Sequence, residues 1–363
     1  MRVCIFGTFD ARRHPRVQVL EEGLTAHGFD LVRCNVPWRA STRERVAASR
    51  RPDVAVRLVA RLVVAWFRLW RQARRISDVE VVVIGYLGVL DVHLARRCFP
   101  RARLVLDHLA PVAGTMSDRG QRGLVGTLAR RLDASAVRRS ALVIVDTPEH
   151  ARLLPGDRSV VVPVGAPQGW FQGEDVVSEP PPLTVVFFGL YTPLHGAPVI
   201  AEALARALDR GARIEVDLVG EGQELRRSRE WLDGRPGVRW WRWVPPDELP
   251  AFVAAHHVCL GIFGTTPKAS RVVPNKVFQG AAAGCAVVTS DTVPQRRSLG
   301  DAGVFVPAGD AAALADVLVA LAEDPTAVSR ARRSARERAE RVYRPEQVIR
   351  PLLERLGAGE RRG

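Results

Sequence analysis

Short apolar runs rich in β-branched residues alternate along the chain with longer segments of helical periodicity. Six runs in the first half have the length and composition of buried strands; they cover residues 3–6, 30–34, 79–85, 103–107, 141–145 and 159–163. Helix-like or loop segments separate these runs. Strands that alternate with helices predict a parallel sheet covered on both faces.

The pattern stops between residues 165 and 182, where glycine, proline and acidic residues predominate, as is typical of a linker. It then restarts with strand candidates at residues 183–188, 214–219, 238–243, 258–262, 286–289 and 303–306. The sequence therefore predicts an α/β chain with two doubly wound, Rossmann-like domains. We expect these domains at residues 1–165 and 183–344, a linker at 166–182, and a helix at 345–363 that crosses back to the N-terminal domain. A chain of 363 residues is long enough for two cores.

In such sheets ligands bind beyond the carboxyl ends of the strands, and a cleft between two domains is the natural pocket. The loop after the first strand contains Gly7, Thr8 and His14, and a helix is expected to begin near Pro15 and Arg16. Free amides and basic side chains at a helix start suit a phosphate or a carboxylate. The loop has no Gly-x-Gly-x-x-Gly motif, which disfavours a dinucleotide-dependent oxidoreductase. An ordinary solvated turn remains the alternative.

The net charge of +14 carries less information than the types of basic residue. Of 53 lysines and arginines only Lys268 and Lys276 are lysine, and Asn275, one of two asparagines in the chain, lies between them. This concentration indicates a site that needs an ammonium rather than a guanidinium. A basic nucleic-acid-binding protein is the alternative from another class. Since the sequence shows neither a basic face with interleaved aromatic residues nor a binding motif, we expect no nucleic-acid partner.

The five cysteines show no metal-ligand or redox spacing. We interpret them as buried thiols and expect neither a metal nor a cofactor. The N-terminus does not resemble a signal peptide, since one arginine and a short strand-like run follow Met1. We therefore expect a cytoplasmic protein.

The most informative segment covers residues 261–288. A strand leads into a loop of glycine, threonine and proline, then into a helix that begins near Asn275 and ends near Gly284, and then into another buried strand. Lys268, Arg271 and Lys276 lie near the helix start. Amides and cations in this arrangement predict an anion site.

Residues 187–196 and 268–279 resemble the retaining family-4 (group 1) glycosyltransferases of GT-B fold. The first stretch is similar to the family's turn Gly-Arg-x-x-x-x-Lys-Gly, with Gly189 in place, Leu190 at the Arg position and His195 at the Lys position. The second reads Lys-x-x-Arg-x-x-Pro-Asn-Lys-x-x-Gln, which resembles a bacterial branch of the family. Here Arg271 and Gln279 stand at the two glutamates of the Glu-x7-Glu motif.

Weaker similarities follow in family order at residues 161–165, 219–222 and 243–245. The resemblance implies a GT-B fold and a metal-independent, retaining transfer of a sugar from a nucleoside diphosphate sugar. The donor-binding residues that it suggests, together with the first-strand loop, are Gly7, Thr8, Gly189, His195, Gly220, Glu221, Val244, Lys268, Arg271, Asn275, Lys276 and Gln279. Lys276 is also a catalytic candidate, through stabilisation of the leaving diphosphate.

The first domain is expected to supply the acceptor side. Family members place a histidine near the fourth-strand loop, and His108 or Asp107 could fill that role. The acceptor-binding candidates are His14, Arg16, Tyr86, Asp118 and Arg119. The acceptor is left open between a lipid-linked molecule, a cell-envelope glycan precursor and a soluble natural product. A sugar-nucleotide epimerase of the same fold is a further alternative.

Residues 54–75 predict a helix with an unusual distribution of charge. At 100° per residue, five arginines fall within about 40° of one line, and the other positions are mainly apolar. Arginines inside the apolar stretch argue against a membrane span. Two interpretations stay open: a helix packed on the sheet, or an interfacial helix at the inner face of the cell membrane.

Overall fold

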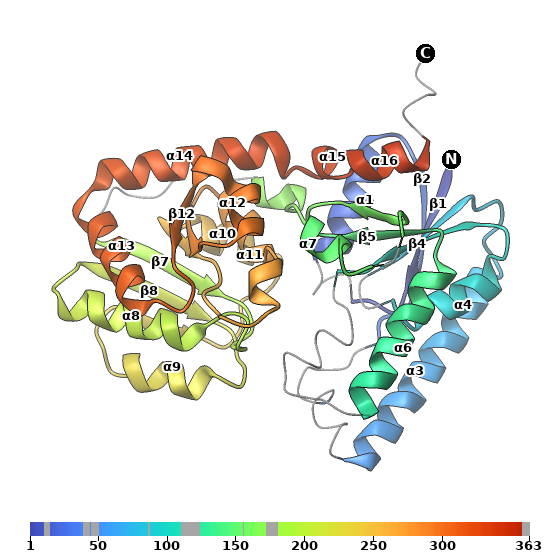
Figure 1. Ribbon diagram of the computed structural model, residues 1–363, viewed down its shortest axis with the longest axis horizontal. Coiled ribbons are helices and arrows are strands. Elements are labelled where there is room, and N and C mark those ends of the chain that lie inside the picture. The colour runs from blue at the N-terminus through green and yellow to red at the C-terminus, as the bar shows by residue number, and fades with distance from the viewer. Residues whose placement is uncertain are drawn as a thin grey trace. The chain divides into compact units, whose positions relative to one another are not determined.

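The computed structural model describes residues 1–10, 15–38, 44, 51–85, 88–109, 124–154, 156–171 and 181–357. Contacts group them into two units. The first comprises Met1–Val145, Leu153–Val162 and the chain from Ile349, and the second comprises Asp146–Arg152 and Pro163–Val348. Figure 1 labels the elements of both units. Each unit is an α/β fold around one parallel sheet, as the alternation of strands and helices predicts.

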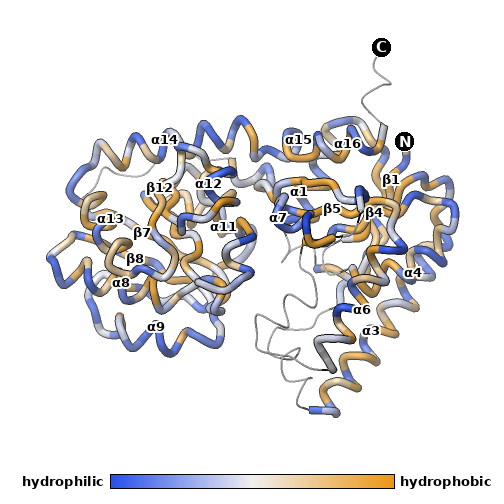
Figure 2. Tube along the Cα trace, in the orientation of Figure 1, coloured by the Kyte–Doolittle hydropathy of each residue, from blue (hydrophilic) through white to orange (hydrophobic). Residues whose placement is uncertain are grey.

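The first unit has a six-stranded parallel sheet in the order β2-β1-β3-β4-β5-β6. Its strands are β1 (Arg2–Gly7), β2 (Asp30–Asn35), β3 (Val81–Ile84), β4 (Arg103–Asp107), β5 (Leu142–Val145) and β6 (Ser159–Val161). Its helices are α1 (Pro15–Ala26), α3 (Pro52–Ala73), α4 (Asp91–Cys98), α6 (Leu124–Arg139) and α16 (Arg350–Leu356). Figure 2 shows the strands of this sheet mainly in the colour of hydrophobic residues, whereas hydrophobic and hydrophilic residues alternate along the helices.

The second unit has a six-stranded parallel sheet in the order β12-β11-β10-β7-β8-β9. Its strands are β7 (Leu183–Phe188), β8 (Ile214–Val219), β9 (Val238–Trp241), β10 (Val258–Leu260), β11 (Ala286–Ser290) and β12 (Gly303–Val306). Its α-helices are α7 (Pro148–Ala151), α8 (Ala197–Asp209), α9 (Leu225–Leu232), α10 (Leu249–Ala254), α11 (Asn275–Ala282), α12 (Val293–Leu299), α13 (Ala311–Glu323), α14 (Pro325–Val342) and α15 (Pro345–Val348). Short 3-10 turns are η1 (Gln168–Phe171), η2 (Ala269–Arg271) and η3 (Gly300–Ala302).

The core of the second unit lies between its sheet and the flanking helices. Leu183, Phe187 and Leu260 from the strands pack with Leu204 of α8 and Leu318 of α13 in one buried cluster. Figure 1 shows α8 and α9 on one side of this sheet, and α12 and α14 on the other. The sheet is therefore covered on both faces, which explains why its strands are continuous apolar runs.

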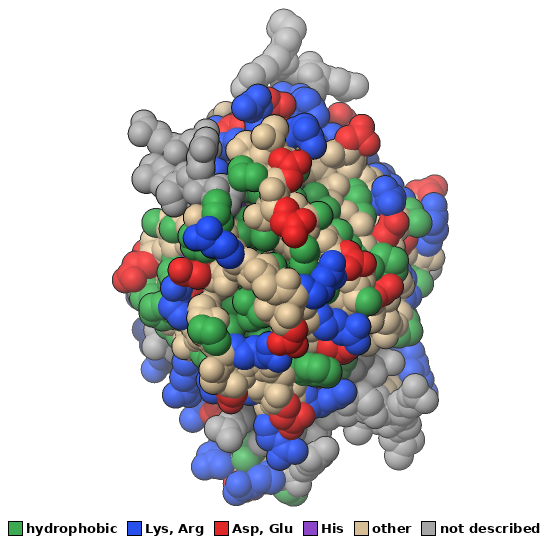
Figure 3. Space-filling model, turned by 90° about the vertical axis from the view of Figure 1, so that its left-hand side faces the viewer, with side chains coloured by type: hydrophobic (Ala, Val, Ile, Leu, Met, Phe, Trp, Pro, Cys, Tyr) green, Lys and Arg blue, Asp and Glu red, His purple; other side chains and the backbone are tan. Residues whose placement is uncertain are grey.

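The helices and one face of the surface bear on how the protein could meet a membrane or a charged partner. Within the described ranges, no helix is both long and apolar enough to cross a membrane. On the face drawn in Figure 3, the described basic and acidic side chains are interspersed rather than separated by sign.

Candidate functional site

The candidate site lies where the strand order of the second sheet reverses. From β7 the chain proceeds to β8 and β9 on one side, whereas β10, β11 and β12 extend the sheet on the other side. In open parallel sheets this switch point, at the carboxyl ends of the strands, is where ligands bind. The turn after β7 and the loop after β10 both begin there.

Two glycines allow the turn after β7 to touch the loop after β10. A Cβ atom on Gly196 would lie 2.6 Å from the amide nitrogen of Gly264, and one on Gly264 would lie 2.1 Å from the carbonyl oxygen of Pro193. The amide of Phe263 donates a 3.0 Å hydrogen bond to the carbonyl of His195. Gly196 also has a φ of 64°, which glycine adopts without strain, at the N-terminal cap of α8.

The loop after β8 approaches the same turn from the other side. Gly220 has a φ of 128°, and a Cβ there would lie 1.9 Å from the carbonyl oxygen of Gly189. The amide of Tyr191 donates to the carbonyl of Glu221 at 3.1 Å. The turn after β7 and the loops after β8 and β10 are thus held together by backbone contacts. A residue larger than glycine at position 196, 220 or 264 would prevent these contacts.

Lys276 projects into this set of loops from the first turn of α11. Its side chain is buried, with 4% of the residue exposed, and Nζ lies 3.7 Å from the ring centre of Phe187. A Cβ on Gly189 would lie 3.1 Å from the same nitrogen. Among the described residues, Nζ has no hydrogen-bond partner. Since a buried ammonium is costly unless it is paired, this amine points to an anion that binds beside Gly189.

His195 lies beside Lys276. A Cβ on Gly189 would lie 3.9 Å from its Nε2, while its Nδ1 lies 3.1 Å from the hydroxyl oxygen of Thr192. Burial, followed by the ammonium of Lys276, lowers the pKa of His195 well below its ordinary value. His195 is therefore a neutral imidazole at neutral pH, and Thr192 can donate to Nδ1 so that Nε2 carries the proton.

Burial also acts on Lys276 itself and lowers its pKa to about 7. Near neutral pH the amine is close to the balance between its charged and uncharged forms. A bound anion would favour the charged form and so restore the proton. Phe187, whose ring lies under Nζ, was not anticipated; the signal would have been its position two residues before Gly189 on the predicted strand.

The other predicted donor residues lie around this centre in different environments. On α11, Gln279 is buried and Asn275 is partly exposed. Lys268 is near enough for its charge to contribute to the lowered pKa of His195. Arg271 donates from Nε to the carbonyl of Pro267 at 2.7 Å, so part of its guanidinium already has a partner. Gly189 and Lys276, 87 positions apart in the sequence, therefore meet in the structure.

Two predicted residues on the β8 and β9 side have other surroundings. Glu221 is exposed and forms an ion pair with Arg242 at 3.3 Å. Val244 is buried. No contact of either residue with Lys276 is seen among the described residues, so their donor role stays a prediction.

In the first unit, the loop after β1 is organised by a buried carboxylate. Thr8 donates to Oδ2 of Asp91 from its amide at 2.7 Å and from its hydroxyl at 2.8 Å, and Trp66 donates to Oδ1 at 2.7 Å. Gly7 adjoins the same group, since a Cβ there would lie 3.1 Å from Oδ2. Burial raises the pKa of Asp91. Asp91 occupies the first position of α4, after a predicted strand, and was not among the predicted site residues.

The predicted residues Arg16 and Asp107 contact each other. Both are buried, and Nε of Arg16 lies 3.3 Å from Oδ1 of Asp107. Arg16 also donates to the carbonyl of Val162 at 3.1 Å. This ion pair connects α1 to β4, so both residues contribute to the structure of the first unit. Their roles in substrate binding or catalysis stay predictions.

His108 is also buried, and its Nε2 lies 3.7 Å from Oδ1 of Asp133 on α6. A catalytic role for His108 stays a prediction. The acceptor candidates His14, Tyr86, Asp118 and Arg119 lie outside the described residues.

The cysteine, histidine and carboxylate side chains are the groups that could bind a metal ion. All five cysteines are free, and all except Cys98 are buried. No three histidine, cysteine, aspartate or glutamate side chains gather in a metal-binding arrangement within the part of the chain that the structure describes.

The part of the chain that carries Lys276 is similar to a known protein family. Residues 182–324 match the family model described as glycosyl transferases group 1. No curated protein sequence matches the chain. The matched residues include the turn after β7, the loop after β10 and helix α11.

Two solved structures of low sequence identity share the fold over nearly the whole chain, and a third shares it over 77% of the chain. Sucrose-phosphate synthase from Thermosynechococcus elongatus is 14% identical with a TM-score of 0.70, and the alignment covers 99% of this chain and 100% of that protein. HepE from Anabaena, solved with UDP and glucose, is 14% identical with a TM-score of 0.68 over the same shares. The pneumococcal O-GlcNAc transferase GtfA, with UDP and GlcNAc, is 12% identical with a TM-score of 0.53 over 77% of this chain and 56% of that protein. The chain thus has the two-sheet GT-B fold of these structures, and residues 182–324 are similar to the glycosyl transferases group 1 family.

Proposed function

We propose that the chain is a glycosyltransferase that moves a sugar from a nucleoside diphosphate sugar to an acceptor hydroxyl. The observation that carries the proposal is the buried amine of Lys276, which has no hydrogen-bond partner among the described residues and lies at the switch point of a glycosyl transferase group 1 domain. A diphosphate is the anion that such a donor brings. It would lie beside Gly189, where a side chain larger than hydrogen would meet Nζ.

In the proposed reaction the bond between the anomeric carbon and the diphosphate oxygen breaks. The acceptor oxygen bonds to the same carbon, and its proton passes to the departing phosphate oxygen or to water. Negative charge develops on the diphosphate as it leaves. Lys276, Nε2 of His195 and the amides at the start of α8 would stabilise that charge, which is commonly the largest single contribution to catalysis.

The finer features of the proposal follow from the family resemblance. We propose that the transfer retains the anomeric configuration and needs no metal ion. Asn275 and Gln279 on α11 would contact the nucleotide, and Gln279 can both donate to and accept from ribose hydroxyls. UDP, which is bound in the HepE and GtfA structures, is the first nucleotide to test. The acceptor would be a glycan or a lipid-linked molecule.

The test compares wild type with Lys276→Met, which keeps the length of the side chain and removes its charge. UDP should raise the melting temperature of wild type, because binding to the folded state stabilises it by mass action. In Lys276→Met we expect the UDP affinity to fall about 10-fold or more and turnover to fall on the order of 100-fold or more, as for lost stabilisation of a leaving group.

Arg330→Met is the matched control, because Arg330 is an exposed residue of α14 in the same unit. It should bind UDP and turn over like wild type. A Lys276→Met protein with wild-type affinity and turnover would contradict the proposal. Donor consumption that is independent of any acceptor would instead indicate an epimerase or a hydrolase.

A further inference from the structure

Helix α3 of the first unit has an exposed apolar stripe next to its packed face. Leu58, Ala65 and Leu69 are buried, and Leu69 belongs to the core cluster of the unit. At 100° per residue, a second set of apolar side chains falls beside this face and points away from the core. Its members are Val56, Val59, Val63, Phe67 and Trp70, which are 68%, 59%, 57%, 56% and 38% exposed.

The far side of the same stripe is bordered by arginines. Arg57 pairs with Asp53 at 2.9 Å, and Arg61 pairs with Glu44 at 3.0 Å. The side chains of Arg68 and Arg71 in the second half of α3, and of Arg75 two residues after the end of the helix, make no hydrogen bond or ion pair within the described residues. The only acidic side chain on α3 is Asp53, and it already has basic partners. Within the part of the chain that the structure describes, the exposed side of α3 therefore carries positive charge without an acidic partner along an apolar stripe.

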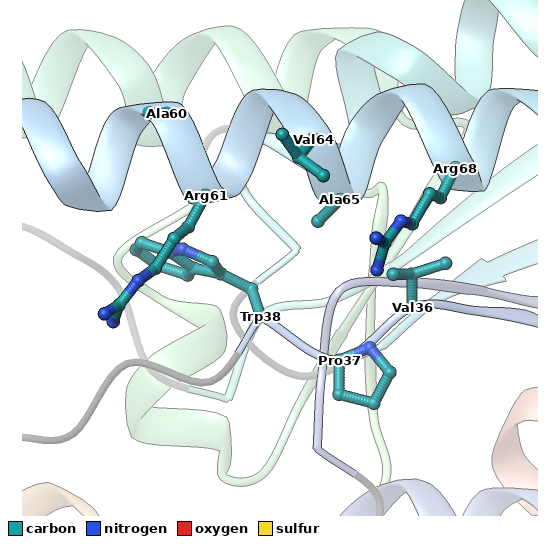
Figure 4. Close-up of a pocket in the computed structure, with 8 residues that line it drawn as sticks. All are labelled: Val36, Pro37, Trp38, Ala60, Arg61, Val64, Ala65 and Arg68. Atoms are coloured by element: carbon teal, nitrogen blue, oxygen red, sulfur yellow. The ribbon is translucent and has the colours of Figure 1, made fainter.

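The arginines also line two adjoining hollows next to α3. One, of about 490 Å³, is lined by Arg61 and Arg68 of the helix and by Trp38 from the segment after β2. Figure 4 shows Arg61 beside the Trp38 ring and Arg68 directed toward Val36. The other hollow, of about 600 Å³, is lined by Arg68, Arg71 and Arg75. No carboxylate is among the described residues that line either hollow.

We propose that α3 docks the protein on the surface of a bilayer that contains anionic lipid. The helix would lie parallel to the surface, with Phe67 and Trp70 in the boundary between headgroups and acyl chains. Arg68, Arg71 and Arg75 would meet lipid phosphates, and the hollows give those headgroups room beside the helix. Exposed apolar area flanked by arginine is the composition that such interfaces require.

The charge distribution favours a lipid surface over a second copy of the chain. Two α3 helices brought together would place unneutralised arginines of both copies in one interface, with only the already paired Asp53 as a helix carboxylate. An anionic bilayer instead supplies phosphates to the arginines and acyl chains to the apolar stripe at the same time. The proposal does not depend on the reaction proposed above, because it concerns a different surface in the other unit.

The test is sedimentation of the full chain with vesicles. Wild type should bind vesicles of phosphatidylcholine with about 30% phosphatidylglycerol, and this affinity should fall in 1 M salt. The triple variant Arg68→Gln/Arg71→Gln/Arg75→Gln should lose on the order of 100-fold in affinity, since each arginine near an anionic surface contributes about fivefold. The double variant Val63→Ser/Phe67→Ser keeps all the arginines, and its affinity for the same vesicles should fall about 10-fold or more because apolar contact is lost.

Two variants of matched chemistry in the second unit serve as controls. Arg330→Gln/Arg333→Gln/Arg341→Gln removes the same charge from exposed positions of α14, and Trp231→Ser/Val293→Ser removes exposed apolar side chains. Both should bind vesicles like wild type. Wild type that fails to sediment, that binds pure phosphatidylcholine equally well, or that binds as tightly after the α3 substitutions would overturn the proposal. UDP-induced stabilisation should be the same in all these variants, so a failure here is distinguishable from a failure of the proposed reaction.

Discussion

At the scale of single residues, the site is defined by the environment of Lys276 more than by its identity. A lysine on a solvated helix has neither a lowered pKa nor a directional role. Here the wall formed by Phe187 and the burial of α11 remove water from the amine and lower its pKa to about 7. Because its hydration is lost, the charged form of Lys276 destabilises the protein without a ligand. The same loss of water strengthens the attraction between Nζ and a bound anion.

This burial predicts a pH-dependent gain in stability when the amine is removed. At pH 6 the amine is protonated in both the folded and the unfolded chain, so wild type bears the full cost of a buried charge. We expect the free energy of unfolding of Lys276→Met to exceed that of wild type there by on the order of 3 kcal/mol.

The difference should narrow as the pH rises. Between pH 7 and the ordinary lysine value of 10.5, the unfolded chain binds more protons than the folded chain, so the stability of wild type increases with pH. Urea unfolding at pH 6, 8 and 10 measures the two curves. Parallel curves, with the same difference at every pH, would show that the amine of wild type is solvated.

At the scale of elements, the site depends on how closely two loops approach. The turn after β7 and the loop after β10 touch at Gly264, where a Cβ would lie 2.1 Å from a backbone oxygen. Backbone atoms on both sides cannot rotate away as a flexible side chain would. The two loops would have to separate to admit a methyl group.

We therefore expect Gly264→Ala to destabilise the second unit by about 1 to 3 kcal/mol, as overpacking does, and to weaken UDP binding. Gly169→Ala is the control, because a Cβ at Gly169 has no neighbour within 4 Å and its φ is not in the left-handed region. Chemical denaturation of both variants measures the difference. Equal stabilities for Gly264→Ala and Gly169→Ala would mean that the loops are not held as tightly as the structure shows.

At the scale of the whole molecule, the end of the chain contributes to the first unit rather than to the second. Leu352 of α16 is fully buried, and the helix contacts β6. Arg355 donates to the carbonyl of Asp157 at 2.6 Å. Helix α16, which follows all residues of the second unit in the sequence, thus packs on the sheet of the first unit.

This connection predicts that a substitution near the C-terminus destabilises the N-terminal sheet. Leu352→Ala should cost about 2 to 5 kcal/mol, the range for a buried leucine, and amide exchange should become faster in β5 and β6. Arg350→Ala, at an exposed position of the same helix, should leave that exchange unchanged. Faster exchange confined to the second unit would contradict this assignment of α16.

The sequence alone predicted the strands of both sheets, the alternation with helices and the helix that begins at Asn275. These features are local, because a buried parallel strand is a continuous apolar run and a helix start is marked by nearby residues. The importance of Lys276 also came from the sequence, through the rarity of lysine. The site residues otherwise came from a resemblance, and the expectation of a pocket between the domains stays a prediction.

Only the tertiary structure decided which of these residues meet. The strand order places the turn after β7 beside the loop after β10, and no local pattern encodes that order. Burial lowered the pKa values of Lys276 and His195. Packing paired Arg16 with Asp107 and made Asp91 the acceptor for Thr8 and Trp66. Hydrophobic periodicity marks which residues are apolar, but desolvation and pairing are properties of the packed chain.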